Sequence, residues 1–176
     1  MNWFTADTHF RHWNCVNYDN RPFQSIEEHD ETIIADWNHL IGKKDTVYHL
    51  GDFCFGSLKI FDEYIDRLNG KIHLIRGNHD HKHAEKCKFE SVSDRKLVSI
   101  NGQLIILDHY AMRVWPKSHY GSWHLYGHSH GNLEEDPNSL SFNVSINATD
   151  YKPISYDYVF ERMRNKDERR TRQETC

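Results

Sequence analysis

The sequence predicts an α/β fold with mixed β-sheets, and two observations lead to this prediction. Strand-like and helix-like segments alternate in the first part of the chain, whereas strand-like segments mostly follow one another in the second part. Alternation predicts helices layered over a sheet, and consecutive strands add neighbours that need no helix between them. A length of 176 residues fits one domain of ordinary size with a proper core.

The predicted strands are short, mainly apolar runs bounded by polar residues. They are residues Asn2–Ala6, Thr46–Leu50, Ile72–Ile75, Lys96–Ile100, Gln103–Leu107, Trp123–Tyr126 and Phe142–Ile146. The last run alternates strictly between apolar and polar residues, which predicts that one face of the strand is buried and the other polar. Between the fourth and fifth runs, Asn101-Gly102 favours a tight turn and so predicts a hairpin.

Three helices are predicted between and after these strands. The segment Ser25-Ile-Glu-Glu28 is a capping box that opens an amphipathic stretch, and Gly42 is a plausible stop signal. A second helix is expected to begin after Ser57 and to end at Gly70, and a third to begin near Ser155.

One compact domain is expected over residues 1–160, because no repeat and no Pro/Gly/Ser-rich linker interrupts the chain. Residues 161–176 contain more basic than acidic side chains and only Met163 as a large apolar one. We expect this segment to be the end of a helix followed by a frayed basic tail.

Composition excludes several classes of protein. A formal net charge of −4 argues against a non-specific nucleic-acid coat and against a polybasic membrane binder. The longest aliphatic run, Leu104–Leu107, is far shorter than the roughly 20 residues of a membrane span. Four scattered cysteines form no Cys-x-x-Cys pair, which suits a reducing cytoplasm. Nothing in the sequence requires an obligate protein partner.

Histidine is the unusual residue, since 14 of them exceed any structural need and histidine is the commonest metal ligand. Five short polar motifs each follow a predicted strand, at the edge where α/β folds gather ligand-binding groups. The motifs are Asp7-Thr-His9, Gly51-Asp52, Gly77-Asn-His-Asp80, Asp108-His109 and Gly127-His-Ser-His130.

The spacing of these residues suits a pair of cations. Asp7 and His9 are two residues apart, so on extended backbone they face the same side and can bind one metal. Asp52 has two carboxylate oxygens and could bridge two metals. The set is completed by Asn78, His109, His128 and His130. Oxygen and nitrogen donors without a thiolate suit Mn²⁺, Fe or Zn²⁺ at adjacent sites.

All five motifs, in this order, resemble the calcineurin-like metallophosphoesterase superfamily. The segment Asn20-Arg-Pro-Phe23 and the stretch Trp123–Gly131 further resemble its small, single-domain bacterial and phage branch. The resemblance implies two mixed β-sheets packed as a sandwich and flanked by helices, an α/β/β/α arrangement. It assigns one metal to Asp7, His9, Asp52 and His130, and the other to Asp52, Asn78, His109 and His128. It gives His79 the role of general acid or transition-state stabiliser, and Asp80 the role of orienting the His79 imidazole.

This resemblance implies a metal-dependent phosphoesterase that uses two divalent ions, with Mn²⁺ the most expected and Fe or Zn²⁺ possible. Charge neutralisation by the metals favours in-line attack of a bridging hydroxide on a phosphate ester. Small phosphodiesters are the expected substrates. A nuclease acting on nucleotides or nucleic-acid ends and a phosphomonoesterase are alternatives, and a non-catalytic metal- or nucleotide-binding module is less favoured. Arg11, Arg76 and Arg113 are candidate phosphate ligands, or alternatively members of surface salt bridges.

Overall fold

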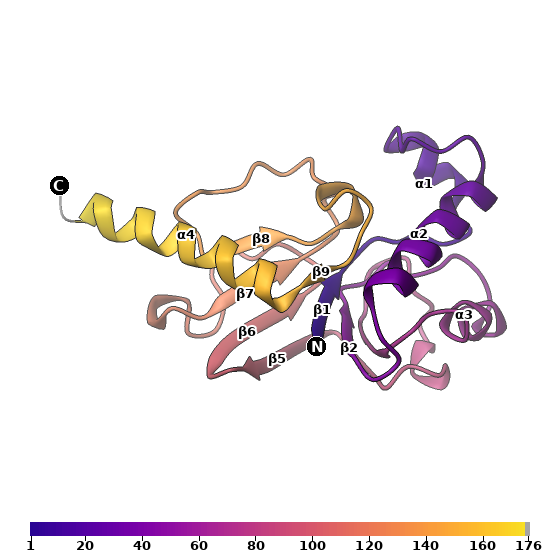
Figure 1. The fold of residues 1–176 in the computed structure, drawn as a ribbon, viewed down its shortest axis with the longest axis horizontal. Coiled ribbons are helices and arrows are strands. Elements are labelled where there is room, and N and C mark those ends of the chain that lie inside the picture. The colour runs from indigo at the N-terminus through magenta and orange to yellow at the C-terminus, as the bar shows by residue number, and fades with distance from the viewer. Residues whose placement is uncertain (175–176) are drawn as a thin grey trace.

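The computed structural model describes the backbone of residues 1–174 and the side chains of residues 1–167. Two β-sheets pack against each other and helices flank them (Figure 1). The larger sheet has the strand order β4-β3-β2-β1-β9 and the smaller one β5-β6-β7-β8. A shared hydrophobic core joins Phe4 and Ile75 of the larger sheet to Ile105 and Leu125 of the smaller sheet.

The strands are β1 (Asn2–Thr5), β2 (Thr46–His49), β3 (Lys71–Ile75), β4 (Ser91–Ser93), β5 (Arg95–Ile100), β6 (Gln103–Asp108), β7 (Trp123–Tyr126), β8 (Ser141–Asn143) and β9 (Ile154–Ser155). The helices are α1 (Trp13–Tyr18), α2 (Ile26–Leu40), α3 (Leu58–Ile65) and α4 (Tyr156–Glu174). The edge strand β9 of the larger sheet and the edge strand β5 of the smaller sheet are each antiparallel to their neighbour. All other neighbouring strands are parallel. Both sheets are therefore mixed, and the predicted sandwich is confirmed.

Helices α2 and α3 cover the outer face of the larger sheet. Ile33 and Trp37 of α2 and Phe61 of α3 share a second hydrophobic core with Val47 and Leu74 of the strands. Burial of these large apolar groups holds the sheet rigid from its outer side. The chain segments that follow β1 and β2 are thereby fixed in position.

The predicted helix signals are mostly confirmed. Ser25 accepts a hydrogen bond from the backbone N–H of Glu28 at 3.1 Å, as a capping box requires. Ser57 precedes α3, but its side chain makes no capping hydrogen bond. The helix also ends at Ile65, before the predicted Gly70.

Helix α4 packs on the smaller sheet through aromatic rings. Tyr156 and Phe160 lie 6.4 and 6.0 Å from the Trp123 ring of β7, measured between centroids. Met163 is fully buried, and the Lys166 ammonium donates to the backbone of β8. The helix thus continues past residue 160, and residues 175 and 176 of the expected tail lie outside the described residues.

The predicted strand 142–146 is wrong in its second half. β8 ends at Asn143, whose side-chain carbonyl accepts the N–H of Ser145 at 2.8 Å and so turns the chain into a 3₁₀ helix at Ile146–Ala148. Asn143 and Ser145 are also buried rather than exposed. The expected hairpin is confirmed, with Asn101 at φ 51° in the turn between β5 and β6.

Parallel strands place several chain segments at one edge of the sandwich. β1, β2 and β3 run in the same direction, as do β6 and β7. The loops that leave their carboxyl ends carry all five polar motifs. Over residues 1–174, every helix is too short or too polar to cross a bilayer.

Candidate metal centre

Backbone hydrogen bonds join four of the motif loops in two pairs. The N–H of Asp7 donates to the carbonyl of Gly51 at 2.9 Å, and the N–H of Gly127 donates to the carbonyl of His109 at 3.0 Å. Between the two sheets, the imidazole of His109 donates from Nδ1 to the carbonyl of Leu50 at 2.7 Å. The candidate ligands are therefore held by the two sheets together.

A first group of ligand atoms comes from Asp7, His9, Asp52 and His130, and these atoms lie within 4.8 Å of one another. Asp52 Oδ2 is 3.5 Å from His9 Nε2, and Asp7 Oδ1 is 3.5 Å from His130 Nε2. The two imidazole Nε2 atoms are 3.2 Å apart. These are the residues expected to hold the first metal.

A second group comes from Asp52, His109 and His128, again with ligand atoms within 4.8 Å of one another. Asn78 Oδ1 lies 3.0 Å from His109 Nε2. Asp52 Oδ2 is 3.5 Å from His109 Nε2, the same separation that it has from His9 Nε2. One carboxylate oxygen therefore belongs to both groups, as a bridging ligand would.

The chemistry of these donors fits cations. Since the Leu50 carbonyl can only accept, the hydrogen of neutral His109 resides on Nδ1 and a lone pair on Nε2. That lone pair faces Asn78 Oδ1 and Asp52 Oδ2, which carry lone pairs themselves. A metal ion bound among these converging acceptors would stabilise them.

Ionisation of the group depends on its environment. Burial lowers the pKa of His9, so its imidazole is neutral and can act as a ligand. Burial also raises the pKa of Asp52. Burial alone would lower the pKa of His130. Hydrogen bonds to Asp19 and Asp7 outweigh burial and raise this pKa to about 12. A cation bound at this group would displace a proton from His130.

The backbone at the ligands is strained. Asp7, His9, Asp52, His128 and His130 all have positive φ, between 47° and 67°. Asp and His tolerate this left-handed region better than most residues, but each such position still costs on the order of 1 kcal/mol. Strain of this kind gathers at functional sites, where it aims side chains that regular strands would point elsewhere.

Two glycines let these loops approach closely. A Cβ at Gly127 would lie 2.6 Å from the Ala6 Cβ and 2.7 Å from Asp7 Oδ2. A Cβ at Gly77 would collide with the Asp52 carboxylate. Only a residue without a side chain fits at these points.

His79 lies beside the first group. Its backbone N–H donates to Asp52 Oδ1 at 2.8 Å, and its ring centroid is 5.6 Å from that of His9. The side chain is exposed, so it can meet a substrate.

Asp80 contacts the backbone rather than the His79 imidazole, which differs from the expected role. Its carboxylate accepts hydrogen bonds from the N–H groups of Gly77, Asp52 and Phe53 at 2.8, 2.9 and 2.8 Å. A carboxylate can satisfy three donors at once, and here it ties the loop after β3 to the loop after β2. Asp80 therefore positions the backbone of Asp52, the candidate ligand that the two groups share.

Comparison with known proteins agrees with this geometry. A sequence model described as the calcineurin-like phosphoesterase superfamily domain matches residues 4–147. The chain belongs to the calcineurin-like phosphoesterase superfamily. The predicted resemblance is thereby confirmed, and membership of this superfamily supports phosphoesterase activity, the hydrolysis of phosphate ester bonds.

Relatives of this phosphoesterase occur in archaea, bacteria and phages. The uncharacterized protein MJ1445 of Methanocaldococcus jannaschii is 37% identical over 161 residues, covering 88% of this chain and 86% of that protein. The Gene 66 protein of Mycobacterium phage L5 is 39% identical over 84 residues, covering 46% of this chain and 40% of the phage protein. The crystal structure of AQ665 from Aquifex aeolicus, a protein of unknown function, superposes with a TM-score of 0.74 at 27% identity over 92% of this chain and 98% of that one.

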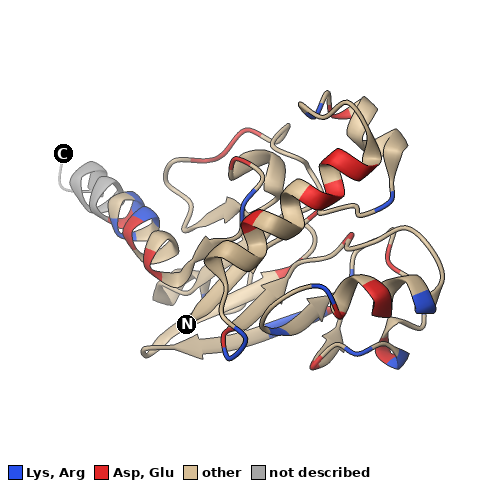
Figure 2. Ribbon diagram, turned by 45° about the vertical axis from the view of Figure 1, so that its right-hand side comes forward, with Lys and Arg blue, Asp and Glu red and all other residues tan. Residues whose placement is uncertain are grey.

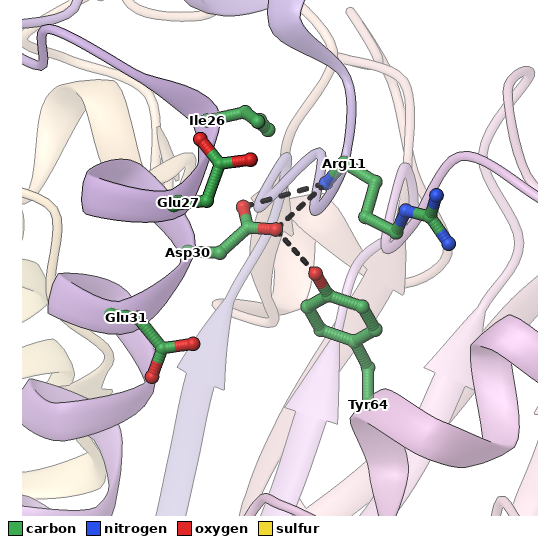
Figure 3. A pocket seen from close by; sticks show the side chains of 6 residues that line it. All are labelled: Arg11, Ile26, Glu27, Asp30, Glu31 and Tyr64. Carbon is green, nitrogen blue, oxygen red and sulfur yellow. Dashed lines mark hydrogen bonds between the residues drawn. The ribbon is translucent and has the colours of Figure 1, made fainter.

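The structure places the three candidate phosphate-binding arginines of this phosphoesterase in different surroundings. Arg76 lines an open depression of about 510 Å³ together with Asn78. Arg11 lines a depression of about 230 Å³ against α2, and its guanidinium points away from Asp30 (Figure 3). Arg113 lines a third depression of about 310 Å³ whose lining residues include none of the candidate ligands. Arg76 therefore lies beside a candidate ligand, but its guanidinium also forms the expected alternative, surface salt bridges with Asp94 and Glu85 at 3.3 and 3.4 Å.

Sequence reasoning missed the residues that orient the ligands. The buried guanidinium of Arg21 donates to the carbonyls of Asp7 and Thr8 at 2.9 and 3.2 Å. It also donates from Nε to the carboxylate of Asp19 at 3.2 Å. Asp19 in turn accepts from His130 Nδ1 at 2.6 Å and so directs Nε2 toward the first group. The motif Asn20-Arg-Pro-Phe23 was the available signal, but the motif alone does not show that Arg21 is buried against the loop of Asp7.

Proposed function

We propose that this phosphoesterase is a phosphodiesterase that depends on two divalent metal ions. The single observation that carries the proposal is that Asp52 Oδ2 is shared by two groups of ligand atoms, one on each side. When bound, the two cations would activate a water molecule near neutral pH and neutralise charge on the phosphoryl oxygens. Mn²⁺ is the expected metal, because the donors are oxygen and nitrogen atoms without a thiolate.

The protein's own residues supply the remaining chemistry. Hydrolysis of a phosphodiester consumes one water: a new P–O bond forms, and the bond to the leaving alcohol breaks. The departing oxygen takes up a proton, and the products are an alcohol and a phosphomonoester. His79 is the exposed imidazole beside the first group, and it would donate this proton.

Geometry around His79 supports this role. Its backbone N–H donates to Asp52 Oδ1, which fixes the distance between the His79 main chain and the shared carboxylate. Asp80 fastens the same two loops a second time. A proton donor on rigid backbone at the rim of the ligand groups can meet a substrate oxygen without a large rearrangement.

The test is hydrolysis of bis(p-nitrophenyl) phosphate, with p-nitrophenyl phosphate as the monoester comparison, in the presence and absence of Mn²⁺. We expect Mn²⁺-dependent hydrolysis of the diester that a chelator abolishes. Asp52→Asn should remove the activity, and His79→Ala should lower kcat by about 10²- to 10⁴-fold. His119→Ala, at an exposed histidine in the turn before β7, is the control and should leave the rate unchanged. Full activity of Asp52→Asn would contradict the proposal.

A non-catalytic protein that only binds a metal or a nucleotide is the less favoured alternative. Neither His79 nor Asp80 belongs to the ligand groups, yet both are held beside them. A binding module has no need of an exposed imidazole fixed at this place. The depression beside Asn78 is open, and an open site suits a small diester.

A further inference from the structure

Two exposed aromatic side chains lie beside the candidate metal ligands. Phe55 is 57% exposed and Tyr110 is 47% exposed. Large aromatic surfaces left in water at a functional site are typical of places where a ligand stacks. Both residues follow a candidate ligand closely in sequence, Phe55 after Asp52 and Tyr110 after His109.

Phe55 lies at the end that carries the first ligand group. One face of its ring stacks on His12, with centroids 4.8 Å apart and an angle of 14° between the planes. His12 Nδ1 is 3.2 Å from His9 Nδ1, and the His12 ring is 5.7 Å from that of His79. The stack on His12 therefore holds the Phe55 ring next to the proposed proton donor, with much of the ring still exposed.

Tyr110 lies at the end that carries the second ligand group. Its ring centroid is 4.6 Å from that of His128 and 5.0 Å from that of His109. Its hydroxyl donates to Asn78 Oδ1 at 3.4 Å. Contacts with three candidate ligands fix the ring in place.

The two rings are thus at opposite ends of the ligand groups, with the shared Asp52 between them. His9 connects Phe55 to the first group through His12, and His128 connects Tyr110 to the second group. A phosphodiester has one organic group on each side of its phosphorus atom. When the phosphate lies over Asp52, one organic group would extend toward each aromatic ring.

Space and polar groups are available beyond Tyr110. The depression of about 510 Å³ that Tyr110 and Asn78 line is within the size range of small-molecule sites. Its wall carries two ion pairs, Arg95 with Asp108 at 2.7 Å and Arg76 with Asp94 at 3.3 Å. Donors and acceptors side by side match the edge of a nucleobase better than they match an apolar group.

Charge limits the length of the substrate. The loop of Arg11 and His12 lies against α2, where the Arg11 N–H donates to Asp30 (Figure 3). Acidic residues follow one another along that helix (Figure 2). They are Glu27, Glu28, Asp30, Glu31 and Asp36, of which Asp30 is buried while Glu31 and Asp36 pair with Arg67 and Lys152. The exposed Glu27 and Glu28 would repel a long polyanion continuing past Phe55, whereas a short substrate would not reach them.

The geometry points to a short phosphodiester that links two nucleosides as the substrate of this site, with one base stacked on Phe55 and the other on Tyr110. This assignment rests on the proposed phosphodiesterase activity and names its substrate class. Stacking on aromatic rings accepts any base, because every base has a π-face. Water adds to phosphorus, one nucleoside leaves as an alcohol with its proton, and the other keeps the phosphate as a monoester.

The experiment compares thymidylyl-thymidine with methyl p-nitrophenyl phosphate in the Mn²⁺-loaded protein. The readout is the ratio of the two kcat/KM values within one protein. Phe55→Leu and Tyr110→Leu should each lower this ratio about tenfold or more, because each loses one base–aromatic stack. Phe55→Tyr and Tyr110→Phe keep an aromatic ring and should restore the ratio. Tyr120→Leu, at a tyrosine 79% exposed in the turn before β7, is the matched control.

The outcomes separate the two proposals. Absence of hydrolysis of both substrates by the wild type would overturn the proposed function itself. Hydrolysis of methyl p-nitrophenyl phosphate with an unchanged ratio in both leucine variants would overturn only the assignment to two nucleosides. A rise of tenfold or more in kcat/KM from thymidylyl-thymidine to a ten-nucleotide strand would show a polymer groove and contradict a short substrate.

Discussion

Replacing Arg21 tests whether one buried cation holds the first ligand loop. Arg21 is 4% exposed, and its guanidinium donates to the carbonyls of Asp7 and Thr8 and to the carboxylate of Asp19. In Arg21→Met these three acceptors lose their donor inside the protein. Removing one partner of a buried ion pair costs about 3–5 kcal/mol, and each orphaned carbonyl adds about 1 kcal/mol. Asp19 keeps hydrogen bonds from other groups, so we expect a total of about 4–5 kcal/mol.

Urea unfolding of the metal-free protein measures this loss. With a urea m-value of about 2 kcal/mol/M, the midpoint should fall by roughly 2 M. Arg67→Met is the matched control: Arg67 forms an exposed ion pair with Glu31, and its loss should cost less than about 1 kcal/mol. Arg21→Lys should fall between the two, because one ammonium cannot span the three acceptors, and it keeps the test usable if the methionine variant does not fold. A midpoint for Arg21→Met equal to that of Arg67→Met would refute the reasoning.

Three further predictions concern the ligand loops and the core. Asp80→Asn should weaken Mn²⁺ binding about tenfold or more in calorimetry, because it loosens the backbone of Asp52. His79→Ala is the control and should leave the Mn²⁺ affinity unchanged. Equal affinities for the two variants would be evidence against the backbone role of Asp80. Gly127→Ala should cost about 1–3 kcal/mol of stability and reduce Mn²⁺ binding, while Gly42→Ala, whose added Cβ has its nearest neighbour at 3.6 Å, should do neither. Burial lowers the pKa of His49 from 6.5 to about 3, so as the pH falls the unfolded state takes up a proton before the folded state does. The free energy of unfolding of the metal-free protein should therefore decrease below pH 6.5, by about 2 kcal/mol at pH 5. His49→Gln should flatten that part of the pH profile, and an unchanged slope would argue against His49 as its source.

The seven predicted strand segments and the five motifs could be predicted because both depend on local pattern. Apolar runs that end in Asp, Asn, Gly or His are visible in the sequence, and parallel strands bring such ends to one edge. The grouping of Asp7, His9, Asp52 and His130, and that of Asp52, Asn78, His109 and His128, follow from this edge together with the resemblance to the superfamily. The role of these residues as metal ligands remains a prediction.

Elements that depend on tertiary contact could not be predicted. β4 and β9 have three and two residues, too few for a periodic pattern, and α1 has six residues and no side-chain cap. The strand predicted at 142–146 ends early because the Asn143 side chain hydrogen-bonds to its own backbone, an option that alternation of polarity does not reveal.

Side-chain direction was the least predictable property of the site. Asp80 follows His79 directly, which favoured an interaction between them, yet the three N–H groups that its carboxylate meets come from two separate loops. Arg21 meets the backbone of Asp7 and Asp19 meets the imidazole of His130, and both of these partners have positive φ. These positive φ values are properties of the folded backbone, and composition alone gives no sign of them.

Anomalous X-ray scattering from crystals soaked in Mn²⁺ tests the central claim most directly. The account predicts two peaks about 3.5–4 Å apart, the spacing of two-metal hydrolytic sites. Asp52 Oδ2 should lie between the peaks, with Asp7, His9 and His130 around one of them and Asn78, His109 and His128 around the other. In Asp52→Asn crystals at least one peak should weaken. Crystals that show no manganese at these residues, or a single ion not touched by Asp52, would contradict the account.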